Sequence, residues 1–172
     1  MPPSKESKGI KIVSNTSPII NLSKISRLDL IEKLYQKIII PGTVYKELIV
    51  KDHDKENILA IKSLIDNNII DVHEVRSYAL VSALEKDLDP GESEAIALAV
   101  EINAELVILD ERDARETAEI YNLKKTGFIG ILMRAKKEGF IDSVKKYLDQ
   151  AIEKGFWINE LLYHSIIEKL NE

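Results

Sequence analysis

The sequence predicts an α/β fold: an α/β/α sandwich on a central, mainly parallel sheet, with extra helices at the C-terminal end. Two observations lead to this class. Short β-rich runs alternate with stretches whose apolar residues recur at helical spacing. The run from Leu106 to Leu109 is continuously apolar, as expected for a strand that helices cover on both faces of a parallel sheet.

The expected elements follow one another with short connections. Strands are predicted at residues 10–14, 38–40, 69–75, 106–109 and 124–127. Helices are predicted at 18–34 (in two pieces broken near Ser26 and Arg27), 41–49, 54–66, 89–102, 112–121 and 128–170 (in at least three pieces, separated by Gly139 and Gly155). Pro18 suits the first turn of a helix capped by Thr16 or Ser17, and Asp89 with Pro90 opens the clearest helix.

The chain of 172 residues is long enough for one domain with a buried core. We expect a flexible polar tail at residues 1–8, a main α/β domain at 9–130, and a helical extension at 131–172 packed on the same domain. No apolar run approaches the roughly 20 residues of a membrane span, and the first residues lack the apolar centre of a signal peptide. These features predict a cytoplasmic protein with no membrane partner.

Composition excludes several kinds of chemistry. The chain has no cysteine, which removes disulfides, thiol catalysis and cysteine–zinc sites. Its three histidines, His53, His73 and His164, are too scattered for a local ligand motif. The formal net charge of −5 argues against a generally basic surface for nucleic acid, although it leaves room for a local basic patch.

Polar side chains are expected at one edge of the sheet. Right-handed crossovers place the carboxyl ends of parallel strands together, at the edge where α/β proteins bind ligands. Asn15 follows the first strand and Asp110 follows the apolar strand. Glu92 lies in the first turn of its helix, on the inward face that Ala95 and Ile96 share.

Two further glutamates are candidates on weaker grounds. Glu47 borders the apolar face of its own helix, and Glu94 lies about 200° of helix rotation away from Glu92. Several carboxylates at one edge repel each other, and a hard divalent cation makes their arrangement favourable. Mg²⁺ or Mn²⁺ there would acidify a water that attacks a phosphodiester. The alternative is structural: these acids favour helix N-termini, and the acids from Asp110 to Asp113 pair with Arg115.

Four segments in order resemble the motifs of PIN-domain proteins. They are Ile12 to Ile20, Ile40 to Leu48, Leu88 to Ala99, and Leu106 to Asp110. Their order and spacing are similar to those of the family over roughly residues 10–130. The segments Thr126 to Gly130 and Gly155 to Phe156 resemble one subfamily of predicted prokaryotic PIN nucleases.

The resemblance implies a Mg²⁺- or Mn²⁺-dependent nuclease that cleaves RNA. Many PIN proteins are toxins of toxin–antitoxin pairs, are held by a small antitoxin, and form homodimers. Carried over by position, the catalytic and metal-binding residues would be Asn15, Glu47, Glu92 and Asp110, with Asp113 as a further metal ligand and Ser17 and Glu94 in support.

The chain departs from the family pattern at its first position, where Asn15 replaces an aspartate. An amide oxygen still coordinates a cation, but it brings no negative charge. The alternative function is therefore a catalytically weakened PIN-fold module that binds RNA or a protein. A receiver-type signalling domain is a third hypothesis, which the lack of an acidic pair after the first strand disfavours.

A basic segment lies close to these acids. Residues 124–146 carry seven basic and two acidic residues, and a nuclease needs cations beside its acidic pocket. The candidates for contact with nucleic acid are Arg112, Arg115, Lys124, Lys125 and Arg134. The alternative is an ordinary solvated helix face. Aromatic residues of the last third are expected in the core, or on the surface of a dimer or antitoxin complex.

Overall fold

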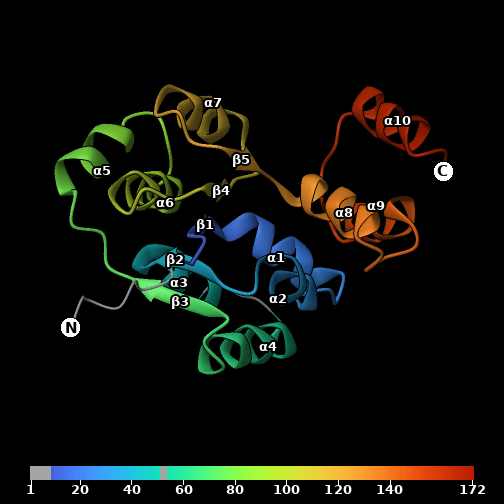
Figure 1. The fold of residues 1–172 in the computed structure, drawn as a ribbon, viewed down its shortest axis with the longest axis horizontal. Helices are drawn as coiled ribbons and strands as arrows, with labels where there is room; N and C mark the ends of the chain where they lie inside the picture. Colours follow the sequence, from blue (N-terminus) through green and yellow to red (C-terminus); the bar gives the residue numbers. More distant parts are fainter. Residues whose placement is uncertain (1–8, 51–53) are drawn as a thin grey trace, which may run out of the picture.

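A five-stranded parallel sheet forms the centre of the fold in the computed structural model, which describes residues 9–50 and 54–172 (Figure 1). Its strands are β1 (Ile12–Ser14), β2 (Ile38–Pro41), β3 (Ile70–His73), β4 (Leu106–Ile108) and β5 (Lys125–Thr126), in the order β3-β2-β1-β4-β5. Every neighbouring pair is parallel. The tail expected at residues 1–8 lies outside the described residues.

Helices connect and follow the strands. They are α1 (Thr16–Lys24), α2 (Asp29–Tyr35), α3 (Gly42–Val50), α4 (Lys55–Asp66), α5 (Tyr78–Leu84), α6 (Pro90–Glu101), α7 (Arg112–Ile120), α8 (Phe128–Lys137), α9 (Val144–Glu153) and α10 (Glu160–Lys169). The predicted fold class is confirmed.

The two faces of the sheet carry separate cores. Ile12, Ile40 and Ile108 face a core shared with α1–α4 and α8–α10. Val13 and Val107 face the other core, shared mainly with α6 and α7. This alternation is the two-residue period of a strand. Since both faces are covered, the central strands β2 and β4 are apolar at every position, and β1 is apolar except at Ser14.

Most predicted elements are present, with small differences at their ends. The strand expected at residues 69–75 is shorter, and the cap expected at Thr16 or Ser17 is wrong because α1 already begins at Thr16. Asn15 is the N-cap residue, and its side chain forms no capping hydrogen bond. Helix α5 is not predicted by the sequence analysis; its first turn has no acidic residue, and the side chain of its N-cap residue, Ser77, forms no capping hydrogen bond.

The C-terminal helices pack on the same core as α1 and α2. Ile131, Leu132 and Ala135 of α8 are buried there, together with Leu148 of α9 and Ile166 of α10. Helix α8 runs across the boundary that we expected at residue 130, and that division stays a prediction.

The parallel pairing of β1 with β4 sets the edge that matters for function. Ser14 pairs with Ile108 at the carboxyl ends of these strands, and the Asn15 amide donates a 3.0 Å hydrogen bond to the Ile108 carbonyl. Asn15 and Asp110 therefore leave the sheet at the same edge.

A carboxylate from the end of the chain closes the start of α9. Glu172 accepts hydrogen bonds from the Ser143 hydroxyl (2.8 Å), the Val144 amide (3.1 Å) and the Lys145 amide (2.7 Å), and it contacts the Lys136 ammonium. Burial raises the pKa of Glu172, but these partners outweigh burial and lower it to about 2.

We predict that Glu172→Gln destabilises the protein at neutral pH. The folded-state pKa lies below the unfolded one, so the carboxylate contributes stability above about pH 4.5, and this contribution is lost as the pH falls towards 2. Urea unfolding should show a loss of about 1–3 kcal/mol at pH 7 that shrinks by pH 3. Glu160→Gln, an exposed change on α10, is the control. A loss that stays constant down to pH 3 would contradict this role.

Candidate functional site

The junction of β1 and α1 contains a buried polar atom without a partner. Asn15 is only 3% exposed, and its side-chain oxygen forms no hydrogen bond with the described part of the chain. An unpaired buried oxygen is costly, because it has lost its bonds to water without replacing them. Such an atom is a candidate ligand for a cation.

The Glu47 carboxylate lies beside this oxygen, against the first turn of α6. A Cβ atom added at Gly91 would lie 2.9 Å from Glu47 Oε1 and 3.2 Å from Asn15 Oδ1. The missing side chain of Gly91 therefore leaves room for both oxygens. The Thr16 hydroxyl donates a hydrogen bond to Glu47 Oε2 and holds the carboxylate there.

Glu92 follows in the same turn of α6 and is 5% exposed. It forms a reciprocal capping box with Asp89: the Glu92 amide donates to Asp89 Oδ1 (2.8 Å), and the Asp89 amide donates to Glu92 Oε2 (3.3 Å). Burial and the neighbouring carboxylates of Asp89, Glu111 and Asp113 raise the pKa of Glu92 to about 7. Glu92 is thus only partly ionised near pH 7, and a cation bound nearby would favour its ionised form.

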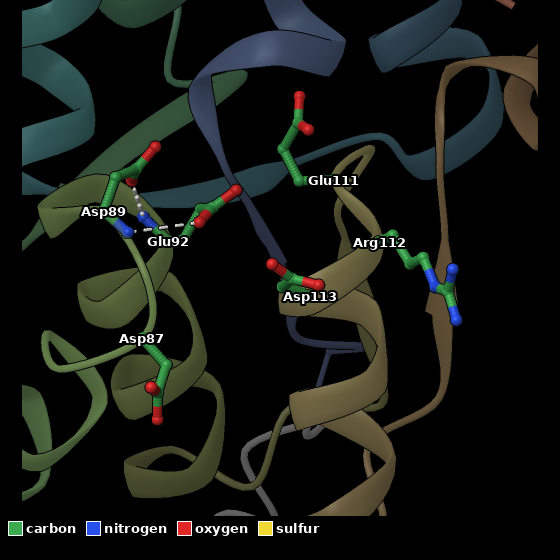
Figure 2. Close-up of a pocket in the computed structure, with 6 residues that line it drawn as sticks. All are labelled: Asp87, Asp89, Glu92, Glu111, Arg112 and Asp113. Atoms are coloured by element: carbon green, nitrogen blue, oxygen red, sulfur yellow. Dashed lines mark hydrogen bonds between the residues drawn. The ribbon is translucent and has the colours of Figure 1, made fainter.

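An acidic pocket of about 300 Å³ opens beside Glu92, between the first turns of α6 and α7. It is lined by Asp87, Asp89, Glu92, Glu111, Arg112 and Asp113. Figure 2 shows Glu92 extending towards the start of α7, while Glu111 extends upwards in this view, away from Asp113, and Asp87 and Arg112 point away from the centre.

Asp110 is more buried than the three charged residues that follow it in sequence. Its Oδ1 accepts a 2.7 Å hydrogen bond from the Phe128 amide, and its Oδ2 accepts a 3.1 Å bond from Asn21 Nδ2. Burial raises the pKa of Asp110, and these two hydrogen bonds oppose the rise. The Asp110 carboxylate, which the sequence analysis expects in the site, is thus hydrogen-bonded to the start of α8.

Ser17 and Glu94, which we expected to support the site, lie at different places from Glu92. Glu94 Oε2 accepts a 3.0 Å hydrogen bond from the Thr43 amide, which ties α6 to the first turn of α3. Ser17 lies half-buried in the first turn of α1, and the hydroxyl that holds a site carboxylate is that of Thr16, one residue earlier.

Four of the predicted nucleic-acid contacts have partners within the protein. Arg112 pairs with Glu116 (2.7 Å), Lys125 with Glu119, and Arg134 with Glu138 (2.7 Å). The Arg115 guanidinium donates to the Leu109 carbonyl (2.9 Å), and Lys124 is exposed. Their role in binding RNA stays a prediction.

The donors present fit a hard divalent cation in kind. They are carboxylate oxygens and one amide oxygen, the ligands that Mg²⁺ and Mn²⁺ prefer. Asn15 supplies an unpartnered oxygen next to Glu47, in a space that a side chain at residue 91 would fill. However, across residues 9–50 and 54–172 no three acidic or histidine side chains stand close enough to hold an ion as they are.

Sequence reasoning missed several residues that shape this site. Thr16 holds the Glu47 carboxylate, and Asn21 holds the Asp110 carboxylate. Gly91 leaves room for the oxygens of Asn15 and Glu47. Glu111 lines the acidic pocket. The conspicuous signal in the sequence was Gly91 between Pro90 and Glu92, where a missing side chain lets another segment approach.

The parallel sheet defines the chain as an α/β protein, and acidic residues lie at its carboxyl edge, the edge at which α/β proteins bind ligands. The DUF3368 family, described as a PIN domain, matches residues 11–172, and the chain belongs to this PIN-domain family.

Other comparisons add less. A PilT N-terminus domain protein from the hyperthermophilic archaeon Sulfolobus solfataricus P2 has a similar solved structure, with 19% identity and a TM-score of 0.49 over 87% of this chain and 100% of that chain. No curated protein matches the chain. Within the described residues, none of the helices has the length and apolar character needed to cross a bilayer.

We predict that Glu92→Gln stabilises the metal-free protein at pH 8 and not at pH 5. The folded-state pKa lies above the unfolded one, so ionisation of Glu92 lowers stability as the pH rises from about 4.5 to 7. Glutamine keeps the capping acceptor but does not ionise. Urea unfolding in a chelator should show a gain of about 1–3 kcal/mol at pH 8. An equal gain at both pH values would refute the buried ionisation, and Glu85→Gln is the exposed control.

Proposed function

We propose that this PIN-domain protein is a Mg²⁺- or Mn²⁺-dependent ribonuclease that hydrolyses RNA phosphodiester bonds. PIN domains are generally nuclease-like, and the family match covers residues 11–172. The observation that carries the proposal is the unpartnered oxygen of Asn15 beside the Glu47 carboxylate, against the turn that presents Glu92. These oxygens would hold the cation.

The protein's own groups have distinct tasks in this proposal. Thr16 orients Glu47, and Gly91 leaves the space in which the oxygens of Glu47 and Asn15 converge. With a cation bound, Glu92 would be ionised, its proton having passed to solvent, and its carboxylate would accept a proton from an attacking water. The bound cation would neutralise the carboxylates and the substrate phosphate and acidify that water.

The decisive experiment is a cleavage assay with labelled RNA, with and without Mn²⁺. We expect cleavage by the wild-type protein with Mn²⁺ and none with a chelator. Glu47→Gln and Glu92→Gln should each lower the rate at least about tenfold while the protein stays folded. Glu85→Gln, an exposed change at the end of α5, is the matched control. Cleavage that survives both site variants, or that ignores the metal, would refute the proposal.

A module that binds RNA or protein without cleavage is the second candidate. The neutral Asn15 favours it, as do the hydrogen bonds that already occupy Glu47 and Asp110. RNA binding in a mobility-shift assay, with no cleavage in Mn²⁺, would select this function.

We predict that Asn15→Asp tightens Mn²⁺ binding and raises any nuclease rate. The substitution adds a negative charge beside Glu47, so the metal-free site becomes more repulsive and the cation-bound site more favourable. Calorimetry should show a Kd lower by about tenfold, and the metal-free protein should melt at a lower temperature. No change in either measurement would remove Asn15 from the site.

We place the expected antitoxin or second copy of the chain at the C-terminal helices. Trp157 and Leu161 are 80% and 81% exposed, and Leu162 is 49% exposed. Apolar side chains that form a contiguous exposed patch are typical of an interaction surface, and these three are candidates for one. Light scattering of the purified chain tests the homodimer, and co-expression with a small neighbouring gene product tests the antitoxin.

A further inference from the structure

A second hollow, of about 220 Å³, lies between α5 and α7, and the residues around it are mainly apolar. Leu84, Leu88 and Ile120 line it together with Thr117 and Tyr121. None of the described residues around it is basic. The hollow is smaller than the roughly 300–1,000 Å³ of sites for whole small-molecule ligands, so its size suits one flat ring system.

Asp87 connects this hollow to the acidic pocket, because it lines both. Figure 2 shows its side chain extending away from Glu92 and Asp89. Asp87 is exposed, and within residues 9–50 and 54–172 its carboxylate has no hydrogen-bond or ion-pair partner. Its two oxygens are therefore available to accept hydrogen bonds from a ligand.

A base of single-stranded RNA has the chemistry that these side chains can bind. Apolar and aromatic side chains contact the face of an unstacked base, and polar groups recognise its edge. The carboxylates of the acidic pocket repel phosphate, whereas a base is neutral. Guanine presents two adjacent donors, its ring N1–H and its amino N–H, to a single carboxylate. Adenine and cytosine present an acceptor beside their amino group, so a carboxylate such as Asp87 selects guanine.

We propose that the hollow between α5 and α7 is a base-binding subsite that prefers guanine, with Asp87 accepting hydrogen bonds from the edge of the base. A nucleotide bound there would place its backbone next to the acidic pocket, because Asp87 belongs to both hollows. This inference rests on the proposed ribonuclease function and assigns a substrate preference to the same site.

Titration of nucleosides into the ¹⁵N-labelled protein tests the subsite without metal or cleavage. With a chelator present, guanosine should shift the amide NMR signals of residues 83–88 and 117–121. Its Kd should be at least about fivefold lower than that of adenosine, cytidine or uridine. Nucleosides carry no phosphate, so repulsion by the acidic pocket does not mask binding of the base.

Two exposed residues of the hollow provide variants that should stay folded, which the remaining NMR signals report. Asp87→Asn replaces one acceptor oxygen with a donor and should abolish the advantage of guanosine; Asp66→Asn, at the exposed end of α4, is its control. Ile120→Glu places a charge at the apolar wall and should weaken guanosine binding at least about fivefold. Its control is Leu59→Glu, since Leu59 is 66% exposed on α4 and Ile120 is 76% exposed.

Other results would overturn the subsite. Equal Kd values for the four nucleosides exclude the guanine preference, and unchanged signals of residues 83–88 and 117–121 at millimolar guanosine exclude the subsite itself. If the same signals shift when the protein alone is diluted, this face is a contact between copies of the chain. The Mn²⁺ cleavage assay decides the ribonuclease function separately. Cleavage without an effect of guanosine refutes only the subsite, and guanosine binding without cleavage supports the subsite and refutes only the ribonuclease.

Discussion

The parallel pairing of β1 with β4 is the constraint on which the candidate site depends. It brings Asn15 and Asp110, ninety-five positions apart in the sequence, to one edge of the sheet, where the Asn15 amide bonds to the Ile108 carbonyl. Helix α6 packs against β1 and β2, so its first turn reaches the same edge and carries Gly91 and Glu92 with it. Loss of this register would separate Asn15 from Asp110.

Much of the fold could be predicted from the sequence because it depends on local signals. The apolar run of β4 and the Asp89-Pro90 start of α6 specify their own structure, and both are present. The site was less accessible, because a sequence shows which residues are acidic but not which way they turn. Asp110 and Glu111 are adjacent and chemically alike. Only the folded chain shows that one lies against the start of α8 while the other lines a pocket.

The asparagine at position 15 is consistent with the crowding around it. Its oxygen and the Glu47 carboxylate both approach the backbone at Gly91, and Glu92 is the next residue. An aspartate would add a second carboxylate beside that of Glu47, and mutual repulsion would then disfavour the folded protein unless a cation were bound. The Asn15 amide keeps an oxygen in place with less repulsion from the neighbouring carboxylate. Asparagine therefore favours the stability of the metal-free fold, whereas aspartate would favour metal binding.

The carboxylate of Glu172 at the start of α9 also affects how a polyanion meets this protein. A helix N-terminus attracts phosphate through its free amides, but here an internal anion already satisfies the amides of Val144 and Lys145 and neutralises Lys136. The positive charge of the basic segment, residues 124–146, is therefore partly neutralised by the protein's own Glu172. A nucleic-acid backbone crossing α9 would have to compete with the chain's own glutamate for those donors.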